Sequence, residues 1–343
     1  MPGHVRLLTI AFITALALAC GGGGDRNRTP GPTPLPPAPP PPPSDEWTAS
    51  GTIVGTLSGT PVSGAELRSA SGAAVTATTD SQGRFQLTGT TRPGESPFRV
   101  IVDAPAHVTR DVWLDWQRGA RPDVHVDMIP SRAPFSLSFY RAFARNSLES
   151  PDDPLSLRRL TSAPSFYVRT VDENGKAIDP AVVSLITSSI RKAVRDFTGG
   201  RYQAAAVQTG TAARSARTGW INVDIVRQTD EGENVCGFAY VGADPGSITL
   251  VYDRCGCGST KISGAVVMHE VGHAMGFFHV GDTKSLMYPF VPSRCPPGAL
   301  SPAELHHARI AYARPRGNLD PDRDPSSAAL ARPVDQDPIK IVN

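Results

Sequence analysis

Two histidines and a glutamate between residues 269 and 273 have the types and spacing that bind a metal ion and activate water. His269 and His273 are four residues apart, so on a helix they lie on one face and can direct ring nitrogens at one ion. Glu270 follows the first histidine and can reach a water molecule held at that ion. This spacing predicts a helical metal site with a carboxylate beside it, which suits hydrolysis.

A third histidine follows at a distance that a continuous helix cannot bring back to the same ion. His279 lies six residues after His273, and Gly276 stands between them. Glycine adopts positive φ at little cost, so Gly276 can end the helix and turn the chain back. Three imidazoles leave one position for water, as in catalytic rather than structural Zn²⁺ sites. The alternative, a buried helix with incidental histidines, must explain three of the chain's eight histidines within eleven residues.

The segment 269–279 resembles the long zinc-binding motif of the metzincin metallopeptidases. These enzymes have a methionine turn downstream, and Met287, within the Ser-Leu-Met-Tyr-Pro of residues 285–289, resembles that of the matrixins. The resemblance implies one catalytic Zn²⁺ on the three histidines, with Met287 as a hydrophobic floor beneath the imidazoles. It also implies an endopeptidase in which Glu270 takes a proton from the attacking water and passes it to the leaving amine.

The chain departs from the matrixins at three points. Val280 follows the third histidine, where matrixins usually have Ser or Thr, and residues 135–268 contain no histidine for their second, structural zinc. No cysteine between Cys20 and Cys236 could keep the enzyme latent in the matrixin manner. We therefore expect a matrixin-like bacterial peptidase with one Zn²⁺; Ca²⁺ is compatible with the family, but no calcium site is readable.

Two functions are consistent with the motif. The first is an endopeptidase that acts on proteins or peptides, with substrate extended along residues 248–252 as an added strand. The second is a non-catalytic binding or adhesion lipoprotein with a zinc-containing scaffold, but an intact Glu270 favours the first. A net charge of +2, from 34 basic and 32 acidic residues, gives no reason to expect nucleic acid. We expect a monomer.

The elements around the motif indicate a mixed α/β (α+β) catalytic domain over residues 135–315, with a twisted mixed sheet and three main helices. Strands are predicted at 166–171, 221–226 and 248–252. One helix is predicted from Asp179-Pro180 to Gly199, a second begins near Ser263, and a third begins at Ser301, where Glu304 completes a capping box. Residues 316–343 lack periodicity and are expected to form a disordered tail.

Residues 47–130 have a different pattern, with short runs of Val, Thr and Ile separated by turns. Strands are predicted at 52–54, 65–67, 75–77, 85–87, 98–102 and 124–126. Regular spacing without a helical pattern predicts an all-β sandwich. The segments 61–65 and 79–85 resemble those of carboxypeptidase regulatory-like domains. The sequence does not distinguish a spacer, a substrate-binding module and a latency device.

The N-terminus is typical of an exported protein. Residues 1–19 have a basic start and a thirteen-residue apolar stretch, which together predict a signal peptide. Small residues before Cys20 resemble a bacterial lipoprotein signal, which implies acylation of Cys20 and a membrane anchor in the periplasm or at the cell surface. The alternative is an ordinary secretory signal. Residues 20–46 are rich in glycine and proline, which predicts an extended tether.

Four further cysteines lie within sixty residues of one another: Cys236, Cys255, Cys257 and Cys295. Export places them in an oxidising compartment, so disulfides are expected. A bond between Cys255 and Cys257 would close a very tight ring, so these two are expected to supply one partner each for Cys236 and Cys295. A second zinc site at Cys255 and Cys257 is the alternative.

Overall fold

The computed structural model describes residues 47–70, 76–89, 98–114, 123–256, 261–290, 298–326 and 339–342. Contacts divide the chain into Met1–Pro43 and Ser44–Asn343, and the described residues all lie in the second unit. The predicted signal peptide and tether, with Cys20, lie outside the described residues, as do Cys257 and Cys295. Within the described ranges, no helix has both the length and the apolar character needed to cross a membrane.

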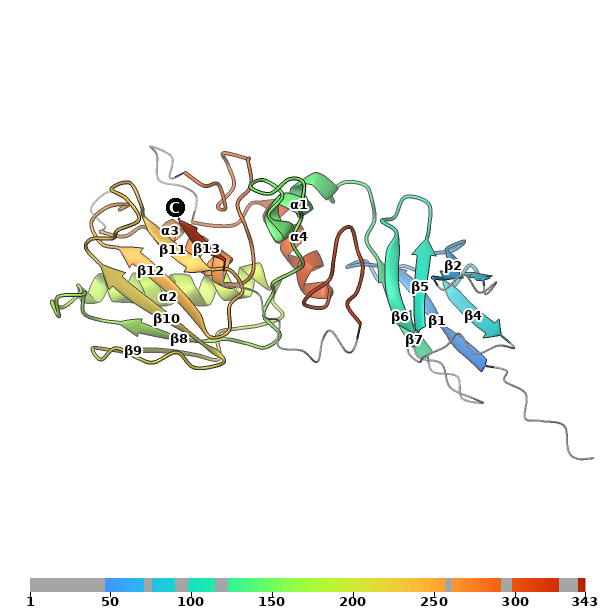
Figure 1. Ribbon diagram of the computed structural model, residues 1–343, viewed down its shortest axis with the longest axis horizontal. Helices are drawn as coiled ribbons and strands as arrows, with labels where there is room; N and C mark the ends of the chain where they lie inside the picture. Colours follow the sequence, from blue (N-terminus) through green and yellow to red (C-terminus); the bar gives the residue numbers. More distant parts are fainter. Residues whose placement is uncertain are drawn as a thin grey trace, which may run out of the picture. The chain divides into compact units, whose positions relative to one another are not determined.

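The first region consists of strands in two sheets around one hydrophobic core (Figure 1). The strands are β1 (Trp47–Gly55), β2 (Glu66–Ser69), β3 (Thr76–Thr78), β4 (Arg84–Gly89), β5 (Phe98–Asp103), β6 (Arg110–Leu114) and β7 (Asp123–Met128). The sheet orders are β4-β1-β7, with β1 parallel to β7, and β3-β2-β5-β6, antiparallel throughout. Ile53, Leu67 and Val100 lie in the shared core. This region has the two layers expected for 47–130, and β6 is an additional strand.

The second region contains a six-stranded sheet of order β13-β11-β12-β10-β8-β9. Its strands are β8 (Ser165–Arg169), β9 (Ala206–Gly210), β10 (Trp220–Val226), β11 (Gly237–Tyr240), β12 (Gly246–Val251) and β13 (Lys340–Val342). Strands β12, β10, β8 and β9 are parallel to one another, whereas β11 is antiparallel to both of its neighbours, β12 and β13. This is the mixed sheet expected for an α/β domain.

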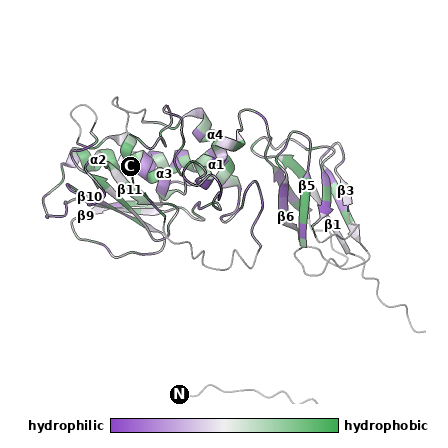
Figure 2. Ribbon diagram, turned by 45° about the horizontal axis from the view of Figure 1, so that its top comes forward, coloured by the Kyte–Doolittle hydropathy of each residue, from purple (hydrophilic) through white to green (hydrophobic). Residues whose placement is uncertain are grey.

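The described residues form four helices beside this sheet: α1 (Leu137–Arg145), α2 (Pro180–Phe197), α3 (Gly264–Ala274) and α4 (Pro302–Ala313). α3 contacts β11, β12 and α2, whereas α4 packs against α1 and α2. Residues of α2 such as Ile186 and Ile190 share one core with alternate residues of the central strands, such as Val223 on β10. Figure 2 shows hydrophobic stretches on the strands and helices that form these cores. The sheet and α2 thus form the support on which α3, the helix with the metal motif, is placed.

The expectation of three main helices was wrong, because α1 is a fourth. Ser136 caps its start by accepting from the Phe139 amide (3.3 Å), and Asn146 ends it in a left-handed conformation with φ of 61°. Tyr140 and Phe143 point into the core. The apolar residues of α1 gather on one face, but its length of only 9 residues makes the helical pattern too short to be recognised in the sequence.

Much of the segment expected to be a disordered tail has a definite structure. Asn318 and Asp322 are buried, and the Asn318 side-chain amide donates to Asp322 (3.0 Å). The buried guanidinium of Arg145 donates to the Asn318 carbonyl (2.7 Å), and that of Arg314 pairs with Asp322 (2.7 Å). Residues 340–342 form β13. The prediction failed because a polar composition is usually taken to mean a solvated chain. Here the polar side chains are buried, and they form hydrogen bonds and ion pairs with one another.

The strand proposed for substrate binding was also misplaced. Residues 248–252 lie mostly in β12, which is an inner strand between β10 and β11. Its backbone groups pair on both sides, so no peptide can add to it. The strand next to α3 on the outer side is β11, which has only four residues and therefore gives no clear pattern in the sequence.

Candidate active site

Helix α3 places the first three motif residues in the interior of the domain. Ser263 caps its start by accepting from the Ala265 amide (3.1 Å). Apolar residues surround the helix on all sides, which is the pattern of a buried helix. His269 is 7% exposed, and His273 and Glu270 are fully buried. Polar side chains placed this deeply require partners or an ion to offset their desolvation.

Gly276 turns the chain back after the helix, as the sequence predicts. It has φ of +101°, and a β-carbon there would lie 2.8 Å from the Arg158 carbonyl carbon. The positive φ and the lack of space for a β-carbon mean that no other residue type fits at position 276 unless the backbone shifts. The Phe278 amide donates to the Phe143 carbonyl on α1 (2.8 Å), which fixes the returning segment. His279 is thereby brought beside the two helical histidines.

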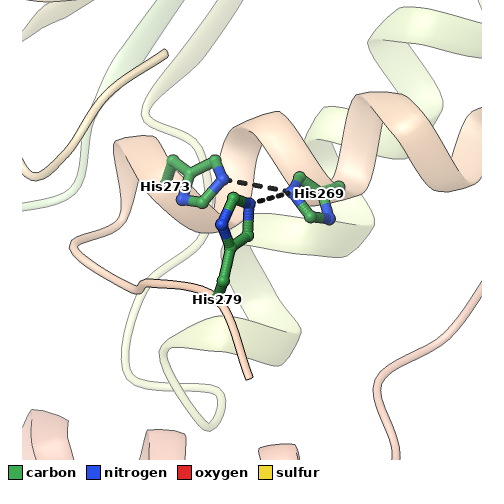
Figure 3. Close-up of side chains that lie close together, drawn as sticks. All are labelled: His269, His273 and His279. Carbon is green, nitrogen blue, oxygen red and sulfur yellow. Dashed lines mark hydrogen bonds between the residues drawn. The ribbon is translucent and has the colours of Figure 1, made fainter. Parts of the chain in front are cut away.

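The three imidazoles converge on one point, with His269 and His273 coming from α3 and His279 from the segment that follows it (Figure 3). Their Nε2 atoms are close together: His269 to His273 is 3.1 Å, and His269 to His279 is 3.3 Å. In the described part of the chain, this is the one group of three or more His, Cys, Asp or Glu residues placed to hold a metal. The three predicted ligands therefore lie together.

The other ring nitrogen of each histidine faces an acceptor. His269 Nδ1 lies 2.6 Å from the Leu286 carbonyl, His273 Nδ1 lies 2.8 Å from the Phe277 carbonyl, and His279 Nδ1 lies 2.7 Å from Glu149 Oε1. Each Nδ1 must therefore carry the proton, which leaves Nε2 as a lone pair on all three rings. Three lone pairs that face each other at these distances repel unless a cation lies between them.

A cation resolves that repulsion, and the donor set fits zinc. Zn–N bonds of about 2.0–2.1 Å at tetrahedral angles place neighbouring nitrogens about 3.3 Å apart. The observed Nε2 separations of 3.1 and 3.3 Å match this spacing. Acceptors on the far nitrogens are also the usual companions of metal-bound histidines, because they fix the tautomer and the ring orientation.

Glu149 is part of this arrangement, although the sequence analysis did not identify it. It lies just after α1, and its side chain is 38% exposed. The carboxylate both orients His279 and increases the electron-donating ability of that ring. Nothing in the sequence around residue 149 distinguishes it from other surface acids, so only the fold could reveal it.

Replacing Glu149 by Gln or Ala is expected to lower zinc affinity by about 10–100-fold, with the larger effect for Ala. The reason is that His279 loses the acceptor that fixes its orientation, whereas the other two rings keep their carbonyl partners. Chelator competition measures the affinity directly. Asp152→Asn, at an exposed acid three residues away, is the matched control, and equal affinities for all variants would contradict this role.

The Glu270 carboxylate lies against Gly237, the first residue of β11. A β-carbon on Gly237 would lie only 2.9 Å from Glu270 Oε1 and 2.8 Å from the Thr249 carbonyl. Gly237 is therefore required for the carboxylate to reach this position. The Glu270 side chain is fully buried, so its carboxyl group lies away from bulk water.

Met287 lies directly against the catalytic helix. A β-carbon on Gly272 would lie 2.6 Å from the Met287 sulfur, so a glycine within the motif makes room for the methionine. Met287 is fully buried, and its amide donates to Ser285 Oγ and Glu304 Oε1, both at 3.0 Å. Buried Glu304 also accepts from the Ser301 amide (2.6 Å), so one carboxylate joins the methionine turn to the start of α4.

Helix α4 also supports the end of α3. The hydroxyl of Tyr312 donates to the carbonyl of Met275, the residue that caps the C-terminal end of α3, at 3.0 Å. Complete burial raises the pKa of Tyr312 above its usual value, so the phenol keeps its proton. Glu304 and Tyr312 together fix the positions of Met287 and Gly276 relative to the histidines.

One of the expected disulfides is present beside the site. Cys236 and Cys255 are bonded, with Cα atoms 5.4 Å apart. Cys255 thereby pairs with Cys236 and is not a zinc ligand; the pairing of Cys257 and Cys295 stays a prediction. The disulfide borders a hollow of about 730 Å³, whose lining residues include Glu233, Arg254, Pro289 and Phe290. Cys236, which also lines the hollow, directly precedes Gly237, and Pro289 follows the methionine turn in the sequence.

Comparisons with known proteins agree with this geometry. A family model for matrixin matches residues 258–303, and one for metallo-peptidase family M12B, reprolysin-like, matches residues 162–280. Comparison with curated protein sequences gives no match.

Solved structures similar to this chain include one that matches a small part of it. It is a type II cohesin–X-dockerin complex from Acetivibrio cellulolyticus, at 18% identity and a TM-score of 0.20, covering 24% of this chain. This chain spans 57% of that one, and so low a TM-score supports no conclusion about fold. The two family matches and the three-histidine site together identify residues 162–303 as a metzincin-like metallopeptidase region.

Proposed function

We propose that the protein is a zinc-dependent endopeptidase. The observation that supports this best is the convergence of three Nε2 lone pairs beside the buried Glu270 carboxylate. Three protein ligands leave a position for water or substrate, which is the property of a catalytic zinc site. Substrates are proteins or peptides, and a side chain of the substrate enters the hollow next to the disulfide.

In this proposal, each residue of the site has a separate task. His269, His273 and His279 hold the ion, and the acceptors on their Nδ1 atoms keep them in the tautomer that binds it. Bound zinc supplies a Lewis acid that activates water and polarises the scissile carbonyl. Glu270 accepts the proton of the attacking water and delivers it to the leaving amine. Met287 and Glu304 keep the floor of the site rigid.

The test is cleavage of a loosely folded protein by the whole exported chain. Casein incubated with the zinc-loaded protein is expected to be cut at internal bonds, and chelation is expected to stop the reaction. Fragment masses distinguish an endopeptidase from an exopeptidase. If the protein holds zinc but cleaves neither casein nor gelatin, the proposal fails and the scaffold function is favoured; if it holds no metal, both functions fail.

We also propose that Cys20 anchors the protein to a bacterial membrane. The support is the sequence alone: the apolar stretch, the small residues before Cys20 and the proline-rich tether after it. Cys20→Ser is expected to move the protein from the membrane fraction to the soluble fraction of cells that express the complete chain. An unchanged distribution would rule out the lipid anchor.

A further inference from the structure

β11, the second strand of the peptidase sheet, contacts α3, the helix that holds His269 and His273. β11 is joined to α3 at both ends: Gly237 lies against the Glu270 carboxylate, and the Gly242 amide donates to the His273 carbonyl (3.0 Å). β12 occupies the inner side of β11, so the outer side is where an extended peptide can add. A peptide bound there would have its backbone beside the catalytic groups.

Residues 339–342 occupy this outer edge. β13 pairs antiparallel with β11 in the register Phe238 to Val342, Ala239 to Ile341 and Tyr240 to Lys340. The Val241 amide continues the ladder by donating to the Ile339 carbonyl (2.9 Å). The backbone groups of β11 that an added substrate strand needs are thus bonded to a segment of the same chain.

Side chains hold this segment on both of its faces. Ile341 is 7% exposed and packs with Val241 and Phe278, and Phe278 directly precedes the ligand His279. On the other face, Lys340 Nζ lies 4.0 Å from the centre of the Phe238 ring and forms an ion pair with Glu231. Together with the ladder, these contacts resemble the recognition of a bound peptide: backbone pairing with alternate side chains in separate pockets.

We propose that residues 339–342 are an internal ligand that occupies the outer edge of β11 and competes there with extended peptide substrates. The inference rests on the proposed function and deepens it, because it names a segment of this chain that regulates access to the site. The preferred peptide is an extended segment with a branched aliphatic residue opposite Ala239 and a cation before it, as in the Ile-Lys-Ile-Val of residues 339–342. Substrate must displace this segment before it can bind.

The test uses the complete chain with Ile341→Asp, which places a charge among Val241 and Phe278 and leaves the histidine site untouched. A fluorescent peptide with the sequence of residues 335–343 is expected to bind this variant and not the wild type, as measured by anisotropy. If the segment is docked about 90% of the time, KM falls about 10-fold in the variant with kcat unchanged. Deleting residues 338–343 is expected to give the same two results.

Leu305→Asp is the matched control, because Leu305 is 37% exposed on α4 and its substitution introduces the same charge. If Ile341→Asp and the deletion of residues 338–343 both melt like the wild type but bind no peptide and keep the wild-type KM, the proposal is wrong. If Ile341→Asp and the deletion both unfold while Leu305→Asp stays folded, the segment is a structural edge strand and the proposal is also wrong. If the peptide binds the Ile341 variant while no form of the protein cleaves casein, the proposed function fails and the peptide-binding edge stands.

Discussion

Replacing Glu270 by Gln is expected to lower kcat/KM by about 10²–10⁴-fold, with zinc content unchanged. The amide is nearly the same size as the carboxylate, so it fits beneath Gly237 where the chain leaves no spare room. It cannot accept the proton of the attacking water. The loss corresponds to about 3–5 kcal/mol of transition-state stabilisation.

This substitution separates catalysis from metal binding, because Glu270 is not among the three residues whose ring nitrogens converge. Cleavage of a fluorogenic peptide and metal analysis of the same sample provide both readouts. Glu66→Gln is the matched control, at an exposed position on β2 in the other region of the chain. A Glu270→Gln variant that retains full activity would show that another group handles the proton.

Replacing His273 by Ala is expected to remove zinc and peptidase activity together. His273 is the most deeply buried of the three ligands, and its Nε2 lies 3.1 Å from that of His269. Two imidazoles cannot complete a stable zinc site. Zinc affinity should therefore fall by more than the factor of about 10–100 expected when Glu149, the partner of one ring, is replaced. Metal analysis after gel filtration is the measurement.

The control for this variant is His306→Ala. His306 lies on α4, outside the cluster, and is only partly buried. It should keep both zinc and activity. The His273 variant is also expected to show no stabilisation by added zinc in thermal melts, because ligand binding raises stability only where a site exists. Zinc binding of wild-type strength by His273→Ala would contradict the assigned ligand set.

The metal motif could be predicted from the sequence because its chemistry is local. Helical spacing brings His269 and His273 together, and a glycine turn returns His279 within a few residues, so no long-range contact is needed. The structure brings these residues together as expected and places Met287 against Gly272. The longer helices and most strands were also predictable from local signals: α2 and the strands have an apolar period, and α4 begins with a capping box at Ser301.

The rest depends on contacts between distant parts of the chain. Glu149 is 130 positions from His279, and Glu304 is 17 from Met287, so neither role leaves a local pattern. The same holds for β13, which pairs with a strand roughly a hundred residues earlier in the chain. The mistaken substrate strand shows the limit most clearly: residues 248–252 are strongly strand-forming, but only the sheet order shows that they are enclosed on both sides.

The most direct test of the zinc-peptidase account is diffraction from crystals of the zinc-loaded protein, recorded on either side of the zinc absorption edge. The account predicts one anomalous peak bonded by the Nε2 atoms of His269, His273 and His279, with Glu270 beside it and not bonded to it. A peak at any other place, or none at these three histidines, would contradict it.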